Sequence, residues 1–269
     1  MSERAFDQAH GLRRLFAHHT VHLLPVAANP YAPGAHMLLE GLCQGFAAQD
    51  LHTLVVDAAP SPYTTGVDVA EAIARDLDLG QWIDELDAHT SVLAASPTLA
   101  WFGEEPGSAD LLFETLREAA PSADVIAFHA DAAILSGLFA NRRVRPLVLT
   151  SDDPASLTEA YAAIKILLQY AGIGEHAVVM DLAAPTLGVP MAATRLARCV
   201  GDFLGGTVHL AALTSTAVQS EADLAQALHL LSTTLLHHAL PFSVQGSEGD
   251  DWSGPALRAQ ASAAHHAFN

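Results

Sequence analysis

"VHLLPVAANPYAPGAHMLLEGLCQGFAAQDLHTLVVDAA", residues 21–59, is the stretch that decides the fold of this chain. It begins with a short apolar run, passes through a loop with two prolines and a glycine, continues at helical spacing and ends in a second apolar run. Short apolar runs that alternate with helices are typical of parallel strands buried on both faces. The stretch therefore predicts strand, loop, helix and strand, the first unit of an open α/β sheet.

The same alternation continues along the chain. The runs that we predict as strands are 21–26, 52–58, 90–96, 123–130, 145–151, 176–183 and 207–213. A helix is expected to start at Asp153-Pro154, because an acidic residue and a proline both suit a first helical turn. Pro25 argues against a central place for the first strand, since proline cannot donate to a strand ladder. We predict a doubly wound, mainly parallel α/β sheet with helices on both faces.

Length and composition fit one main domain. The chain has 269 residues, of which 51% are hydrophobic, enough to bury one sizeable core. We predict a short helix within residues 1–20, a single α/β domain over 21–244, and a loop with a tail over 245–269.

Charge and cysteine usage limit the classes of function. The formal net charge is −18, which repels phosphate backbones, so nucleic acid is not expected as a partner. Cys43 and Cys199 are too few for a disulfide framework, and neither a signal peptide nor an apolar run long enough to span a bilayer is visible. We expect a cytoplasmic protein. The 15 histidines show no zinc-ligand spacing, so no metal is expected.

The loop after the first strand stands where a phosphate-binding loop would stand. Such a loop, G-x-x-x-x-G-K-[ST], needs glycines for its inward N–H groups, a lysine for charge and a hydroxyl for magnesium. Residues 29–36, "NPYAPGAH", keep only Gly34 of that pattern. Asn29 replaces the first glycine, while Ala35 and His36 replace the lysine and the hydroxyl residue. The sequence predicts a degenerate nucleotide site with no bound cofactor.

Two segments carry a resemblance to a known family. Residues 147–183, "LVLTSDDPASLTEAYAAIKILLQYAGIGEHAVVMDLA", resemble the segment that follows the Walker B strand in MinD/ParA-type ATPases, especially in their FlhG (FleN) group of flagellar-number regulators. Residues 7–15, "DQAHGLRRL", resemble the DQAxxLR element with which FlhG proteins stimulate FlhF, a signal-recognition-particle-type GTPase. The resemblance implies a MinD-like P-loop NTPase fold.

The resemblance also assigns family roles to single positions. Pro30 stands in the place of the family's signature lysine, and Asp57 keeps the first acid of an Asp-x-Asp pair whose second acid is replaced by Ala59. His129 aligns with the Walker B aspartate, although Asp131 lies two residues further on. A further aligned position is Asp181, which matches the asparagine that contacts adenine. Since phosphoryl transfer depends on positioning and on cancelling charge, these losses together imply that ATPase activity is absent.

The N-terminal segment is expected to form a short amphipathic helix that is marginal alone. By resemblance, Gln8 would position water at a partner's GTP, Asp7 and Arg13 would fix the helix, and Leu12 would anchor it beside Ala9. The alternative is that this helix packs on its own domain.

These observations lead to one functional expectation and two alternatives. We expect a non-catalytic, FlhG-like pseudo-ATPase that regulates flagellar assembly or placement through an FlhF-type GTPase or another flagellar assembly protein. A heterodimer with an active paralogue stays open. The first alternative is a MinD-type ATPase that binds ATP and magnesium unconventionally. The second is an unrelated α/β enzyme with a site at the carboxyl ends of the strands. The tail 254–269 has one arginine and a shallow apolar face, which does not favour membrane binding.

Overall fold

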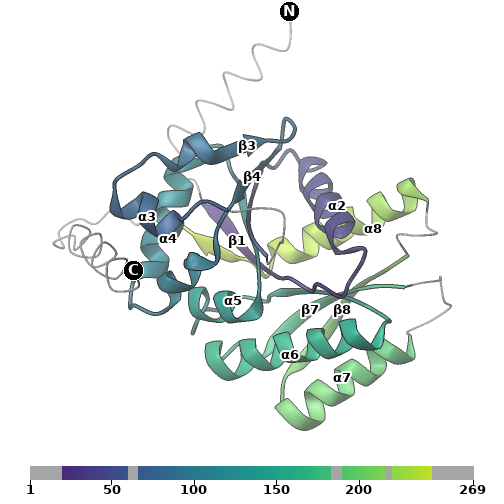
Figure 1. Cartoon of the computed structure of the whole chain (residues 1–269). Helices are drawn as coiled ribbons and strands as arrows, with labels where there is room; N and C mark the ends of the chain where they lie inside the picture. Colours follow the sequence, from purple (N-terminus) through teal and green to yellow (C-terminus); the bar gives the residue numbers. More distant parts are fainter. Residues whose placement is uncertain (1–19, 60–65, 183–189, 216–219, 244–269) are drawn as a thin grey trace, which may run out of the picture.

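The computed structural model describes residues 20–59, 66–182, 190–215 and 220–243. All seven predicted strands are present, and the α/β class is confirmed (Figure 1). They are β1 (Val21–Ala27), β2 (Thr53–Ala58), β4 (Thr90–Ala94), β5 (Val125–Ala130), β6 (Leu147–Ser151), β7 (Glu175–Asp181) and β8 (Thr207–Thr214). Two short antiparallel strands complete the sheet, β3 (Ile83–Glu85) and β9 (Leu240–Phe242). Each has only three residues, too few to show a period in the sequence.

The sheet has the strand order β3-β4-β2-β5-β1-β6-β7-β8, with β9 paired to the start of β1. The strands from β4 to β8 in this order are all parallel. Their carboxyl ends therefore meet at one edge, where open α/β sheets usually bind ligands.

Pro25 corrects one expectation, because β1 lies in the middle of the sheet despite its proline. His22 and Ala28 donate their N–H groups toward the β5 side, so by alternation the nitrogen of residue 25 faces the opposite side. On that side β9 pairs with β1 only up to Leu23, and β6 pairs only from Val26 onward. The proline therefore lies where one neighbouring strand ends and the next begins, and its missing donor costs no ladder bond.

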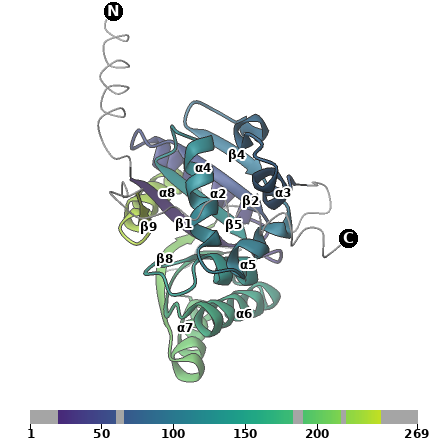
Figure 2. The same ribbon diagram turned by 90° about the vertical axis from the view of Figure 1, so that its left-hand side faces the viewer.

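Helices cover both faces of the sheet. One face carries α2 (Ala35–Ala47) and α8 (Glu221–Leu236), whose apolar residues share a core with β1, β5, β6 and β7. The opposite face carries α3 (Val69–Ala74), α4 (Ser108–Ala119), α5 (Ala132–Leu138), α6 (Pro154–Ala171) and α7 (Met191–Leu204). Two 3-10 turns, Leu79–Trp82 and Pro97–Gly103, lie on the same side. Figures 1 and 2 both show α6 and α7 lying side by side.

Helix α6 starts where the sequence predicts. The Asp153 side chain caps it by accepting from the N–H groups of Ala155 and Ser156, and Pro154 occupies the first turn. Ala160, Ile164 and Leu167 are buried against the sheet at helical spacing, as expected.

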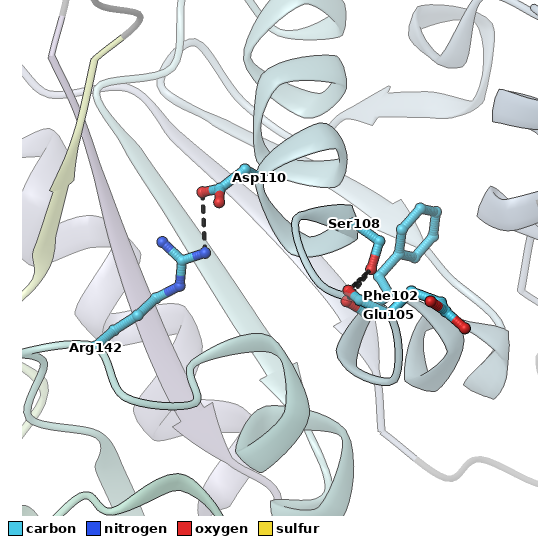
Figure 3. A network of polar contacts seen from close by, with 5 residues as sticks. All are labelled: Phe102, Glu105, Ser108, Asp110 and Arg142. Atoms are coloured by element: carbon cyan, nitrogen blue, oxygen red, sulfur yellow. Dashed lines mark hydrogen bonds and ion pairs between the residues drawn. The ribbon is translucent and has the colours of Figure 1, made fainter. Parts of the chain in front are cut away.

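Helix α4 is fixed at its start by Ser108 (Figure 3). The Ser108 hydroxyl lies 2.7 Å from the Phe102 carbonyl and 2.6 Å from the Glu105 carbonyl. On the same helix Asp110 accepts from Arg142 at 2.9 Å, which links α4 to the segment before β6. Within the described ranges, no helix is both long and apolar enough to cross a membrane.

Candidate functional site

The candidate site lies at the carboxyl ends of β1, β2 and β5. In the sheet His129 of β5 is level with Val26 of β1 and with Asp57 of β2, and each is the residue before the last of its strand. The loop from Ala28 to Gly34 leaves β1 at this point and leads directly into α2. This strand-loop-helix arrangement is the one that the sequence predicts.

Asn29 has a structural role in this loop. Its side chain is 5% exposed, and its amide nitrogen lies 3.0 Å from each of the Leu149 carbonyl, the Ser156 carbonyl and the Ser156 hydroxyl. Its amide oxygen accepts from the Tyr31 N–H at 3.1 Å. Asn29 thus ties the end of β1 to β6 and to the first turn of α6. The sequence contains no signal for this network, because its members lie more than a hundred positions apart.

Most backbone N–H groups of the loop are either absent, at proline, or already donate hydrogen bonds within the loop. Pro30 and Pro33 have no N–H group. The Tyr31 N–H donates to Asn29 Oδ1, and the Ala32 N–H donates to the Asn29 carbonyl. The Ala35 N–H donates to the Ala32 carbonyl. Five of the eight residues in 29–36 therefore have no backbone donor left for a phosphate.

The shape of the loop also differs from a phosphate-binding nest. Such nests alternate right- and left-handed residues so that successive N–H groups converge on an anion. No residue from 28 to 36, all of which the structure describes, has a positive φ, and Gly34 lies at φ −83° and ψ 0°. Gly34 is thus the residue before α2 and does not form a left-handed turn.

Asp57 and His129 form a pair across neighbouring strands. His129 Nδ1 lies 2.9 Å from Asp57 Oδ1, which also accepts from the Ala59 N–H at 3.1 Å. Burial alone would raise the pKa of Asp57, but the hydrogen bond and charge of His129 outweigh it and hold that pKa below its ordinary value of 3.8. At neutral pH Asp57 is therefore a carboxylate paired with His129, the residue that the resemblance aligns with the Walker B aspartate.

Asp131 does not lie at the place of that acid in the strand. It follows the end of β5 and caps α5, where its side chain accepts from the Ile134 N–H at 2.9 Å. His129, and not Asp131, is the residue that faces Asp57.

Asp181 lies apart from this group. It ends β7, is 9% exposed and accepts from the Thr214 hydroxyl at 3.2 Å. In the sheet, β5, β1 and β6 lie between β2 and β7, and Asp181 does not line the cavity that Asp57 and His129 share. The Asp181 side chain is thus engaged with the neighbouring strand β8.

A cavity of ≈ 740 Å³ brings the other predicted residues together. Its lining includes the predicted residues Asn29, Pro30, Ala35, His36, Asp57, Ala59 and His129. Gly34, the remaining predicted position of the described loop, is buried outside this lining. The cavity also contains residues that the sequence did not single out, Glu40 of α2 and Asp87 of the β3–β4 turn. Among the residues that the structure describes, neither lysine nor arginine lines it.

Two further candidate chemistries have little support. Burial raises the pKa of the Cys43 thiol to about 12, so this cysteine stays protonated at neutral pH and is a poor nucleophile. Within the described part of the chain, no group of three or more histidine, cysteine or acidic residues is placed to hold a metal ion. The predicted partner-binding residues Asp7, Gln8, Ala9, Leu12 and Arg13 lie outside the described residues.

The sheet order, the helices on both faces and the strand-loop-helix element after β1 define the fold of MinD/ParA-type P-loop ATPases. A plasmid partition protein from Borrelia burgdorferi matches over 80% of this chain and 98% of its own, with 10% identity and a TM-score of 0.54. A chain of the MinC:MinD cell division protein complex from Aquifex aeolicus matches over 83% and 98%, with 11% identity and a TM-score of 0.53.

A third similar structure is an enzyme. Cobyrinic acid a,c-diamide synthase from Mycobacterium smegmatis, with a bound ATP analogue and magnesium, matches over 83% of this chain and 100% of its own, with 14% identity and a TM-score of 0.54. No protein-family model matches the sequence, and no curated protein matches it significantly. At these identities the likeness establishes the fold.

Proposed function

We propose that this chain is a non-catalytic, FlhG-like pseudo-ATPase that acts through protein contacts. The observation that carries the proposal is the state of the loop after β1, in which five of eight residues have no backbone donor left for a phosphate. Phosphoryl transfer needs such donors together with a lysine and a magnesium ion. The described lining of the cavity beside the loop has carboxylates and no lysine or arginine, which adds repulsion toward a nucleotide.

ATP binding is the first test of this proposal. Titration of magnesium-ATP into the full-length protein by calorimetry is expected to show no binding at physiological ATP concentration. The variant Ala35→Lys/His36→Thr restores the lysine and the hydroxyl and is expected to stay without binding, because the backbone donors remain consumed. Micromolar ATP affinity in the unaltered protein would overturn the proposal.

The flagellar part of the proposal rests on the resemblance of residues 7–15 and 147–183 to FlhG proteins. The expected partner is an FlhF-type GTPase, whose GTP hydrolysis the full-length protein would accelerate. Gln8→Ala is expected to remove the acceleration while leaving binding, because glutamine orients water in related GTPases. Leu12→Ala is expected to weaken binding instead, since it removes apolar contact worth roughly 1.5–3 kcal/mol when fully buried. If no FlhF-type GTPase of the source organism responds, the activator role is wrong.

A second candidate function is a MinD-type ATPase with an unconventional site. The likeness to a synthase with a bound ATP analogue and magnesium favours it, together with the ionised Asp57 at the corresponding edge of the sheet. The same titration separates the two functions, because only this candidate requires ATP to bind.

A further inference from the structure

The cavity beside the loop extends well past the place of a phosphate. Along α2 it is lined by residues one turn apart, with His36, Glu40 and Gln44 exposed and with Leu39 and Cys43 buried. The facing wall consists of β2, β4 and the turn between β3 and β4. The cavity is therefore a groove between a helix and one wing of the sheet.

The walls of this groove are mainly apolar. Val55 of β2 and Leu39 of α2 are buried beneath it, whereas Val92 of β4 is only half-buried, and Leu86 of the turn is 66% exposed. Ligand cavities commonly have volumes between about 300 and 1,000 Å³ and apolar walls with a few polar groups, and ≈ 740 Å³ falls in this range. The groove can thus accept the apolar body of a small molecule.

The charged groups of the groove determine whether a positively or a negatively charged ligand is favoured. In the part of the lining that the structure describes, the carboxylates come from Glu40, Asp57 and Asp87, and the basic side chains are the histidines His36 and His129. The hydrogen bond from the His89 N–H, helped by those from Thr90, lowers the pKa of Asp87 below its ordinary value of 3.8 although burial acts to raise it. From the described residues Ala59 and His129, Asp57 accepts hydrogen bonds on Oδ1. An anionic ligand would meet three carboxylates here, whereas a cation would be attracted.

We infer that this groove binds a small organic amine, with its apolar body against Leu39, Val55 and Val92 and its ammonium group facing the carboxylates. The end with Glu40 and Asp87 is favoured for the ammonium group, because Asp57 already has His129 as its partner and lies nearer the positive end of α2. The inference goes beyond the proposed regulatory function and does not depend on whether ATP binds.

The test uses 2-phenylethylamine as the probe, with 2-phenylethanol and phenylacetate as neutral and anionic molecules of similar shape. Binding to the full-length protein is followed by saturation-transfer NMR at neutral pH. We expect saturable binding of the amine, binding of the alcohol weaker by about tenfold or more, and still weaker binding of the acid. Absence of saturable amine binding, or equal binding of all three molecules, overturns the inference.

Variants locate the site. Glu40→Gln removes one carboxylate from an exposed helix position and is expected to weaken amine binding by about tenfold without changing binding of the alcohol. Val92→Phe fills the groove and is expected to weaken binding of both molecules. Glu85→Gln, an exposed acid of β3 outside the lining, is the matched control and is expected to change neither. An equal effect of Glu40→Gln and Glu85→Gln would place the amine elsewhere and would contradict the inference.

Discussion

Asn29 is the residue whose role differs most from the one that its position in the sequence suggests. It stands where a phosphate loop has its first glycine, yet its side chain is buried and joins β1 to β6 and α6. A glycine there would leave the Ser156 hydroxyl and two carbonyl groups without this donor. The loop is thus held in its observed shape by the protein itself and needs no ligand to order it.

We predict that Asn29→Ala lowers the free energy of unfolding by roughly 1–3 kcal/mol, because buried acceptors lose their donor. Urea unfolding of the variant and of the unaltered protein measures this change. Gln169→Ala, at an exposed position of α6, is the control and is expected to change stability little. An Asn29 variant as stable as the control would show that the network contributes nothing.

His176 of β7 gives the protein an acid-sensitive position. It is fully buried, and burial lowers its pKa from 6.5 to about 4. Between pH 6.5 and 4, His176 is protonated in the unfolded chain and stays neutral in the folded chain. The stability of the fold therefore falls as pH drops from 6.5 toward 4, by a total on the order of 3 kcal/mol.

We predict that His176→Phe flattens this part of the stability curve, since the variant has no proton to gain at this position on unfolding. Urea unfolding at several pH values between 6.5 and 4 measures the slope for both proteins. His237→Gln alters an exposed histidine and is expected to keep the original slope. If His176→Phe and the unaltered protein have the same slope, the assignment to His176 is wrong.

At the scale of elements, α2 and α8 pack so closely that only glycine fits at the contact. A Cβ atom on Gly45 would lie 2.8 Å from the Leu228 carbonyl oxygen and 3.1 Å from its carbon. These are backbone atoms, which cannot move away without shifting a helix. The close contact fixes α2, and therefore the loop before it and the wall of the groove.

We predict that Gly45→Ala costs roughly 1–3 kcal/mol of stability through this clash. The matched control is Gly201→Ala in α7, where the nearest contact of a new Cβ would be at 4.0 Å. That substitution is expected to stabilise the protein by up to about 1 kcal/mol, because alanine favours helix more than glycine does. Thermal unfolding of both variants measures the two changes in stability, which are expected to have opposite signs. Midpoint temperatures that shift in the same direction for both variants would refute the packing argument.

At the scale of the whole molecule, charge governs association. A chain with a formal net charge of −18 repels its own copies unless a specific contact outweighs the repulsion. ATP would provide no such contact if the loop does not bind it, because only a ligand that binds can shift an association equilibrium.

We therefore predict that the oligomeric state is the same with and without magnesium-ATP. Sedimentation velocity at one protein concentration and fixed ionic strength measures it. Raising the salt concentration is the control for charge repulsion, because screening acts on surface charges whether or not a nucleotide binds. Conversion of monomer to dimer on addition of ATP alone would contradict the prediction and favour the ATPase candidate.

The sequence by itself determined the parts of this protein that depend on local pattern. Apolar runs gave the seven longer strands, and the acidic cap with proline gave the start of α6, because period and capping act over a few neighbouring residues. That residues 29–36 contain no lysine, serine or threonine is also visible without a structure.

Only the tertiary structure decided what these elements do together. It allowed Pro25 in a central strand, placed His129 against Asp57 from 72 positions away, and gave Asn29 its buried partners on β6 and α6. It also combined α2 with the β3–β4 turn into one acidic groove. The physical reason is that hydrogen bonds, burial and electrostatic fields depend on distance in space, and chain folding brings together residues that no local pattern connects.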